Sequence, residues 1–202
     1  MNFLTGLNRS LFVFFNTTIA NPFFDATMPY FTDWHKYWIG RGIFAVCWIL
    51  LLWKGGKKGR IVGLMMIPLI VLTDQLASSV VKPIFALPRP CHTIDGATVM
   101  SPLRLLVDCG SGYAFPSSHA TNNTAMAVLL SRHYRQWTPL WTAYAVLMCM
   151  SRMIVGVHFP VDVIGGAVIG ALCALFLNTV LLMLAKRFPF LALPERVQGS
   201  GA

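Results

Sequence analysis

One short stretch decides how the rest of the chain is interpreted: Ser151-Arg-Met-Ile-Val-Gly-Val-His158-Phe-Pro-Val-Asp162. It sets a guanidinium, an imidazole and a carboxylate between two long apolar runs. Ionisable side chains at a bilayer boundary carry a high desolvation penalty, so each of them is a candidate for a functional role. Because proline does not fit a helix interior, Pro160 predicts a tight turn that holds His158 between two helices.

Two earlier clusters have the same character as this stretch. One is Lys82-Pro-Ile-Phe-Ala-Leu-Pro-Arg89-Pro90, and the other is Pro116-Ser-Ser-His119. Both stand at the end of an apolar run or at the start of the next one. We therefore expect the chain topology to bring all three clusters to one face of a membrane.

The composition indicates an integral membrane protein. The chain has 202 residues, of which 56% are hydrophobic and only 11% charged. Soluble domains carry about 25% charged residues, so a soluble globular protein is excluded. The net charge of +9 would favour nucleic acid in a soluble protein. Here the basic residues bracket apolar runs, as in membrane proteins, and we predict no nucleic-acid partner.

The apolar runs predict an all-α membrane protein with a single domain over residues 1–202. The N-terminal segment 1–36 contains a helix over 2–20 that is too short and too polar to span comfortably, and we expect it to lie in the interface. Turn-forming pairs at Asn21-Pro22 and Met28-Pro29 follow it. A long outer loop covers 83–115, and the tail 189–202 is expected to be disordered or loosely attached. Five spans are predicted, over 37–53, 61–81, 117–135, 139–154 and 161–185.

The distribution of basic residues predicts the orientation of these spans. The basic connectors 54–60, 132–135 and 186–187 alternate with the candidate clusters, so they fall on the opposite side of the membrane. The positive-inside rule places such connectors in the cytoplasm. The candidate site is therefore predicted to face outward. The N-terminus lacks the features of a signal peptide and is expected to be retained.

Three of the candidate side chains are suited to holding a multiply charged anion. The guanidinium groups of Arg89 and Arg152 match phosphate oxygens in pairs, and Lys82 adds a compact charge. The helix that opens at Ser117 and Ser118 offers free backbone N–H groups and hydroxyl groups. Together these residues predict a phosphate site.

The two histidines divide into two catalytic roles at such a site. An imidazole oriented by a carboxylate is a competent nucleophile, and Asp162 follows His158 by four residues. His119 is suited to protonate the departing oxygen as a general acid. We predict no metal and no cofactor, because the acidic residues of the outer side are scattered in the sequence; these are Asp25, Asp33, Asp95, Asp108 and Asp162.

The cysteines do not show the spacing of a metal site. Cys91 and Cys109 both fall in the long outer loop. A disulfide between them is compatible with an oxidising compartment, but the sequence does not give the Cα separation that a bridge requires. Paired and free cysteines both stay open.

These motifs resemble the signatures of the type 2 phosphatidic acid phosphatase family. The family pattern is Lys, six residues, then Arg-Pro; Pro-Ser-x-His; and Ser-Arg, five residues, His, three residues, Asp. All three stand with that spacing between Lys82 and Asp162, although Ser118 occupies a position that is often glycine. The resemblance implies a helical core shared with vanadate-dependent haloperoxidases and a metal-independent mechanism through a phosphohistidine on His158.

The resemblance implies a lipid phosphate or diphosphate as substrate, in the outer leaflet of a bacterial inner membrane. Undecaprenyl diphosphate ranks first on the overall layout alone, with phosphatidylglycerophosphate and lipid A as alternatives. A lipid-phosphate binder or transporter without turnover is the alternative from another class. We further expect Asp74 and Gln75 to pair between helices, and His92 and Arg104 to be solvated loop residues. The oligomeric state stays open.

Overall fold

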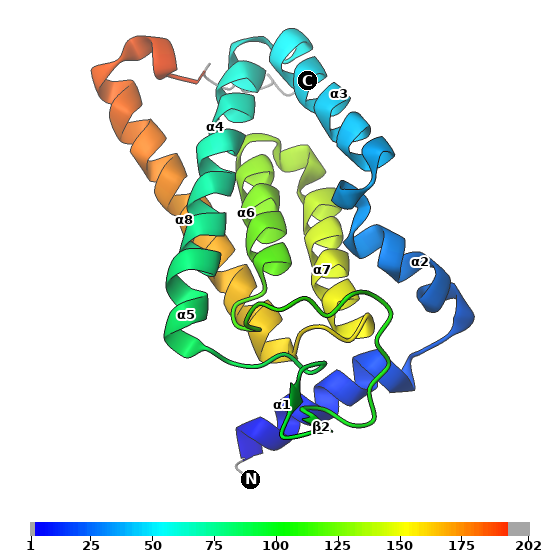
Figure 1. The fold of residues 1–202 in the computed structure, drawn as a ribbon. Coiled ribbons are helices and arrows are strands. Elements are labelled where there is room, and N and C mark those ends of the chain that lie inside the picture. Colours follow the sequence, from blue (N-terminus) through cyan, green and yellow to red (C-terminus); the bar gives the residue numbers. More distant parts are fainter. Residues whose placement is uncertain (1–2, 194–202) are drawn as a thin grey trace, which may run out of the picture.

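The computed structural model describes residues 3–193, and α-helices form most of it (Figure 1). The helices are α1 (Phe3–Val13), α2 (Pro22–Thr32), α3 (Trp38–Lys54), α4 (Gly56–Gln75), α5 (Lys82–Phe85), α6 (Ser118–His133), α7 (Thr138–Ile154) and α8 (Pro160–Arg187). A π-helical segment, Leu76–Val81, joins α4 to α5 into one continuous helix. In the long loop that follows, β1 (Thr93–Ile94) and β2 (Ala97–Thr98) pair as an antiparallel hairpin.

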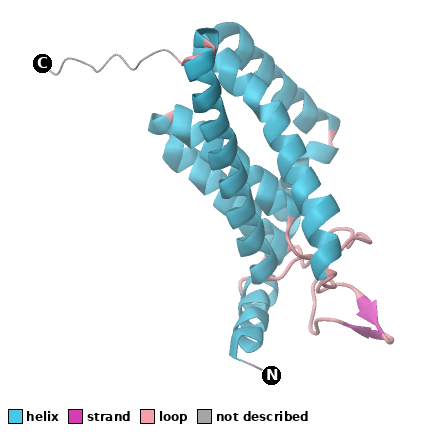
Figure 2. Ribbon diagram, turned by 90° about the vertical axis from the view of Figure 1, so that its left-hand side faces the viewer, coloured by secondary structure: helices cyan, strands magenta, loops and turns pink. Residues whose placement is uncertain are grey.

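The long helices form a bundle with α6 at its centre. Helix α6 packs against α8, α7 and α4, while α3 packs against α4 (Figures 1 and 2). The buried core lies between α4, α6 and α8 and contains Val62, Met65, Met66, Leu69, Ala125, Leu129, Cys173, Ala174 and Leu181. Burying these side chains against one another fixes the relative positions of the three helices.

Helices α6 and α8 approach each other closely at one glycine. A Cβ atom added at Gly170 would lie 2.1 Å from the backbone oxygen of Thr121, so no larger residue fits there without a shift. The contact brings the N-terminal halves of the two helices together. It therefore positions His119 and Asp162, which stand near the starts of α6 and α8.

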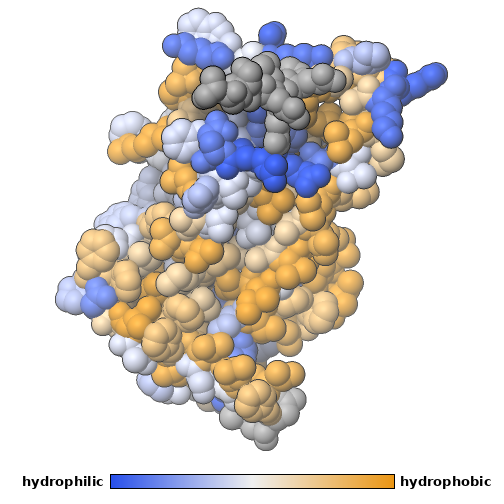
Figure 3. Space-filling view, turned by 180° about the vertical axis from the view of Figure 1, so that it is seen from behind, coloured by the Kyte–Doolittle hydropathy of each residue, from blue (hydrophilic) through white to orange (hydrophobic). Residues whose placement is uncertain are grey.

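The basic connectors and the candidate clusters lie at opposite ends of the bundle, as the sequence predicts. The basic connectors between α3 and α4, after α6 and after α8 lie at one end, and the long loop with the α7–α8 turn lies at the other (Figure 1). In Figure 3, hydrophilic residues gather at one end of the molecule, and hydrophobic residues cover much of the flank below them. This pattern fits a protein embedded in a bilayer.

Two helices among the described residues are long and apolar enough to cross a membrane by themselves, Gly56–Phe85 and Pro160–Arg187. The helices α3, α6 and α7 have 17, 16 and 17 residues. They coincide with the remaining predicted spans, but the number of five transmembrane helices stays a prediction.

The N-terminal segment is more ordered than its turn-forming residues suggest. The region around Asn21-Pro22 and Met28-Pro29 forms helix α2 instead of a series of turns. The Asn21 side chain accepts a hydrogen bond from the backbone N–H of Phe24, and Pro22 occupies the first helical turn, where its missing N–H is not needed. Both residues are therefore helix-start signals here.

The N-terminal segment is also tied to the outer loop. The buried Asn16 side chain donates to the backbone oxygens of Arg104 and Ile154 at 2.8 and 3.0 Å, and the Arg104 side chain forms an ion pair with Asp25. The expectation that Arg104 is a solvated loop residue is therefore wrong. Its contacts fasten the segment 3–33 across the end of the bundle.

The structure also bears on the expectations for Asp74, Gln75 and the C-terminal tail. Asp74 is exposed, and Gln75 accepts a hydrogen bond from Ser79 of the same chain segment, so the two residues do not pair between helices. In the tail, Pro189–Leu191 forms a 3-10 turn. The rest of the predicted disordered tail, from residue 194 onward, lies outside the described residues.

Candidate active site

The three clusters meet at the end of the bundle opposite the basic connectors. Lys82 begins α5, and Arg89 lies in the loop behind it. His119 stands in the first turn of α6, and Arg152 lies in the last turn of α7. His158 occupies the short turn that connects α7 to α8. The expected juxtaposition of the clusters is therefore present in the fold.

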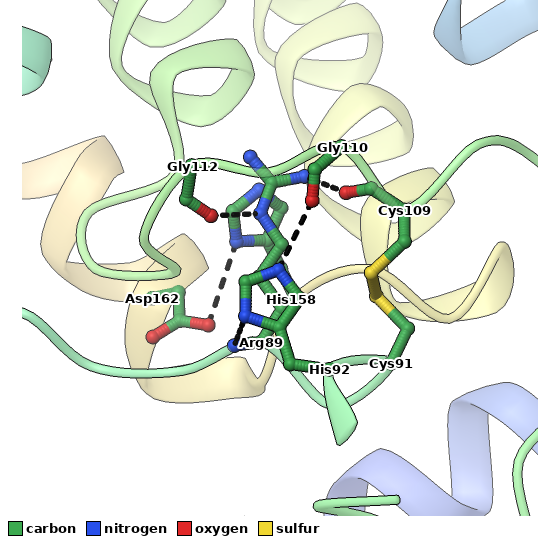
Figure 4. Close-up of a disulfide and its surroundings, with 8 residues drawn as sticks. All are labelled: Arg89, Cys91, His92, Cys109, Gly110, Gly112, His158 and Asp162. Carbon is green, nitrogen blue, oxygen red and sulfur yellow. Dashed lines mark hydrogen bonds and ion pairs between the residues drawn. A yellow bond between two sulfur atoms is a disulfide. The ribbon is translucent and has the colours of Figure 1, made fainter. Parts of the chain in front are cut away.

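His158 and Asp162 form a pair that is buried within the turn. The two residues are each 1% exposed, and Nδ1 of His158 lies 3.5 Å from Oδ2 of Asp162 (Figure 4). The same carboxylate oxygen accepts a hydrogen bond of 2.8 Å from the backbone N–H of Phe159, which caps the start of α8. The carboxylate is thus fixed by the helix start, and the imidazole keeps its Nε2 for other chemistry.

The turn itself depends on a glycine. Gly156 has φ of +88°, and a Cβ atom there would lie 2.4 Å from the backbone oxygen of Arg104. Only glycine adopts this conformation without strain. The turn after α7 therefore presses against the outer loop and buries His158 beneath it.

The start of α6 supplies His119 and two serines. Ser117 is fully buried, and its side chain accepts a hydrogen bond from the backbone N–H of Ala120, so it acts as the N-cap. Its own N–H donates to the backbone oxygen of Asp162 at 2.9 Å, which ties the starts of α6 and α8 together. The hydroxyl of Ser118 lies 3.3 Å from that of Ser78. Phosphate binding by either serine stays a prediction.

Lys82 and Arg89 are held by backbone carbonyls of the long loop. Nζ of Lys82 donates to the oxygen of Tyr113 at 2.6 Å, and Nε of Arg89 donates to that of Gly112 at 2.8 Å. Arg89 also donates through Nη1 to the oxygen of Cys109 (Figure 4). The loop therefore folds back over the two cations.

A disulfide closes this loop. Cys91 and Cys109 are bonded to each other, with their Cα atoms 6.0 Å apart, which settles the alternative left open by the sequence. His92 accepts from the backbone N–H of Arg89 through Nδ1, and its Nε2 lies 3.0 Å from the oxygen of Gly110. His92 is half-buried and contacts the segment around Arg89, whereas the sequence analysis expected a solvated loop residue.

Arg152 is held by a part of the chain that the motifs do not include. Its side chain is only 6% exposed, and Nη1 donates to Oγ1 of Thr32 at 2.8 Å and lies 3.4 Å from Oδ1 of Asp33. Asp33 also contacts His119, with 3.6 Å between Oδ1 and Nε2. Asp33 could not be singled out from the sequence as a site residue, because it stands far from every signature. The one available signal is a polar Thr-Asp pair between aromatic residues.

The charges around the site favour a neutral His158. Burial lowers the pKa of this imidazole, and the charges of Arg152, Arg89 and Lys82 lower it further, well below its usual range. The ring therefore holds an unprotonated nitrogen at neutral pH, as a nucleophile requires. For Asp33, burial raises the pKa, but contacts with His119, Lys36 and Arg152 lower it more, so this carboxylate is ionised.

One group of side chains has the spacing of a metal site. The ligand atoms of Asp33, His35 and His119 lie within 4.8 Å of one another. The same carboxylate, however, contacts the permanent cation Arg152 and lies 2.7 Å from Nζ of Lys36. A third positive charge would meet repulsion there, so the arrangement favours an ion-pair network.

A large apolar groove lies beside the site and not within it. It has a volume of about 1060 Å³ between α6, α7 and α8, and none of the eight predicted site residues lines it. Met153 and Val163, which follow Arg152 and Asp162 in the chain, line its near end. The groove therefore reaches the residues that follow Arg152 and Asp162 in the chain.

Comparisons with known proteins agree with this arrangement. The family model of the PAP2 superfamily matches residues 61–186. A lipid A 4'-phosphatase of Porphyromonas gingivalis is 31% identical over 93% of this chain and 78% of its own length. An undecaprenyl-diphosphatase of Sulfolobus acidocaldarius is 32% identical over 61% of this chain and 55% of its own length.

Among solved structures, the transmembrane PAP2-type phosphatidylglycerolphosphate phosphatase from Bacillus subtilis has the same fold. It superposes with a TM-score of 0.69 at 22% identity, covering 93% of this chain and 90% of the other. The family match extends over more than half of the chain and includes all the motifs of the site. The chain therefore belongs to the PAP2 superfamily of membrane lipid phosphatases.

Proposed function

We propose that the chain is an outward-facing, metal-independent phosphatase that removes a phosphate group from a membrane lipid through a phosphohistidine on His158. The observation that carries the proposal is the meeting of three cations with a buried histidine–carboxylate pair and a second histidine at one end of the bundle. Such a set can bind a phosphate, attack it and protonate the oxygen that leaves, without any further group.

Each step of the proposed reaction has a residue in place. Asp162 holds Nδ1–H of His158, so the lone pair on Nε2 attacks phosphorus and a P–N bond forms as the P–O bond to the lipid breaks. His119 gives its proton to the departing oxygen and then takes one from water, which hydrolyses the phosphohistidine. The separation of 3.5 Å in the pair is long for a hydrogen bond and is expected to tighten when phosphate binds.

A buried donor without a partner supports the placement of the phosphate. Within residues 3–193, Nε of Arg152 is buried and makes no hydrogen bond. Buried polar groups are normally paired, so an anion that accepts from this nitrogen would be stabilised. A phosphate beside Arg152 would supply that acceptor.

Lipid A is the first candidate substrate, because the match to a lipid A 4'-phosphatase extends over nearly the whole chain. Undecaprenyl diphosphate, which the layout of the sequence favours, is the second, supported by a shorter match to an undecaprenyl-diphosphatase. In either case the hydrocarbon chain would lie in the groove between α7 and α8. Ala145→Trp would fill that groove and should raise KM for long-chain substrates, while a dihexanoyl lipid phosphate is hydrolysed as before.

Two features support an outward-facing site in a bacterial inner membrane. The basic connectors lie at the opposite end of the bundle, and such connectors are enriched in the cytoplasm. The disulfide between Cys91 and Cys109 lies in the loop that covers the site, and disulfides persist in oxidising compartments.

The proposal is tested by release of inorganic phosphate from lipid A, undecaprenyl diphosphate and phosphatidylglycerophosphate by the full chain in detergent with EDTA. We expect turnover of at least one lipid, a loss of roughly 10⁴-fold or more in His158→Ala, and no loss in the control Arg60→Ala, which changes an exposed residue at the other end of the bundle. Labelled substrate should mark His158 and not His119. Binding without release of phosphate, kept in His158→Ala, would instead identify a lipid-phosphate binder.

A further inference from the structure

A carboxylate from the N-terminal segment lies beside the two groups that would act on the substrate's phosphate. Asp33 caps the end of α2 and is 7% exposed. Its Oδ1 lies 3.6 Å from Nε2 of His119 and 3.4 Å from Nη1 of Arg152. No signature of the family includes this position. One carboxylate oxygen thus contacts both the expected general acid and the expected phosphate ligand.

We propose that Asp33 is a positioning residue that orients His119 for proton transfer to the leaving oxygen while it holds Arg152 in place. The proposal rests on the role given to His119 above. It adds a second histidine–carboxylate pair to the site, built from two distant parts of the chain, beside the local pair of His158 and Asp162.

The surroundings of Asp33 fix the carboxylate in this place. Oδ2 accepts from Nζ of Lys36 at 2.7 Å, so Oδ1 is left to face the site. Thr32, the preceding residue, is fully buried and accepts from both Ser151 and Arg152 at 3.0 and 2.8 Å. The Thr32-Asp33 pair therefore binds the end of α7 through side chains and cannot move independently of Arg152.

The ring of His119 is restrained from a second direction. Its centroid lies 5.1 Å from that of His35, which is exposed. His119 is thus confined between an aromatic ring and a charged carboxylate. The carboxylate offsets part of the penalty that burial places on the imidazolium form, which is the form that donates a proton.

The dependence of the rate on the leaving group separates this role from a structural one. A lipid phosphate releases a poor leaving group, an alkoxide that needs a proton, whereas p-nitrophenyl phosphate releases a stable phenolate. The full chain in detergent is assayed on dioleoyl phosphatidic acid and on p-nitrophenyl phosphate. For Asp33→Asn we expect a roughly 10- to 100-fold lower kcat on phosphatidic acid and less than about 3-fold on the aryl ester, because general acid catalysis contributes 10²- to 10⁴-fold.

Four further variants complete the test. His119→Ala should show the same dependence on the leaving group. The double variant Asp33→Asn with His119→Ala should be less than about 3-fold slower than His119→Ala alone, because only the support of Arg152 is then still lost. Asp33→Glu should recover part of the loss, since the charge is kept. Asp25→Asn also removes an ion pair of the N-terminal segment, to Arg104, and should leave both rates within about 2-fold.

Equal losses on both substrates in Asp33→Asn, or losses that multiply with those of His119→Ala, would overturn the proposal and leave Asp33 only a support for Arg152. A wild-type chain that hydrolyses neither substrate, nor any of the three lipids that test the proposed function, would overturn that function and this inference with it. If the wild type hydrolyses one of those lipids but not phosphatidic acid, that lipid replaces phosphatidic acid in the comparison. A His119→Ala variant without leaving-group dependence would refute the assigned general acid. If Asp33→Asn does not fold, the same comparison is made with Asp33→Glu, where a loss confined to phosphatidic acid supports the proposal and equal losses refute it.

Discussion

The two arginines of the site are held in different ways. Arg152 is buried against the side chains of Thr32 and Asp33, which stand about 120 residues earlier in the chain. Arg89 is less buried, and backbone carbonyls of its own disulfide-closed loop accept its hydrogen bonds. Backbone carbonyls accept hydrogen bonds from Arg89 whatever side chains the loop carries. The contacts of Arg152, in contrast, require the side chains of Thr32 and Asp33. The two regions should therefore respond differently to the same substitution.

The largest expected contrast is between Arg152→Lys and Arg89→Lys. Lysine keeps the charge but cannot contact Thr32, Asp33 and a phosphate together, so Arg152→Lys should lower kcat/KM by roughly 100-fold or more. In Arg89→Lys, an ammonium group can still donate to the loop carbonyls, and the loss should be roughly 10-fold. Steady-state kinetics with one lipid phosphate measures both. A larger loss in Arg89→Lys would reverse the comparison.

A smaller effect is expected when the loop around Arg89 is opened. The double variant Cys91→Ser with Cys109→Ser removes the bridge between the segments that flank Arg89, and the loop then gains more entropy when it unfolds locally. We expect a rise of roughly 3- to 10-fold in KM and a weaker inhibition by vanadate, with kcat largely kept. Wild-type protein treated with a reductant should behave in the same way.

The control for this experiment is Cys47→Ser, which changes an exposed cysteine on α3 that is not bonded to another. Its KM should match that of the wild type with and without reductant. Loss of kcat instead of affinity in the disulfide variant would show that the loop supports more than phosphate binding.

The smallest expected effect is the change in the stability of the fold when acid protonates Asp33, which contacts Arg152. The pKa of Asp33 in the folded protein lies below its usual range, so its contacts stabilise the fold above the ordinary carboxyl pKa of about 4 and are lost as the pH falls below it. Asp33→Asn should therefore lower stability at pH 7 by roughly 1–3 kcal/mol and by less near pH 3. Thermal unfolding in detergent at both pH values measures this.

The contacts of Arg89 provide the matching control. They are made to backbone carbonyls, which do not titrate, so the effect of Arg89→Lys on thermal stability should be nearly the same at both pH values. An equal effect of Asp33→Asn at pH 7 and pH 3 would mean that the charge of Asp33 does not support the fold.

Much of the site could be predicted from local sequence, because its motifs are short and its partners are near in the chain. Asp162 follows His158 by one helical turn, and Pro160 marks the start of α8 between them. Basic connectors alternate with the clusters along the chain. This alternation predicted that the clusters meet at one end of the bundle. Helix α2 was missed because Pro22 and Asn21 read equally well as turn residues and as helix-start residues.

The amino-acid sequence by itself determined the helical membrane-protein class, the shared end of the bundle and the residues of the three motifs, since periodicity, charge and spacing are local properties. Only the tertiary structure decided that Asp33 contacts Arg152 and His119, that Arg104 fastens the N-terminal segment, and that Cys91 and Cys109 are bonded. Contacts between distant segments depend on how helices pack, and packing is set by close approaches such as that of Gly170 to Thr121, which no pattern of polar and apolar residues encodes.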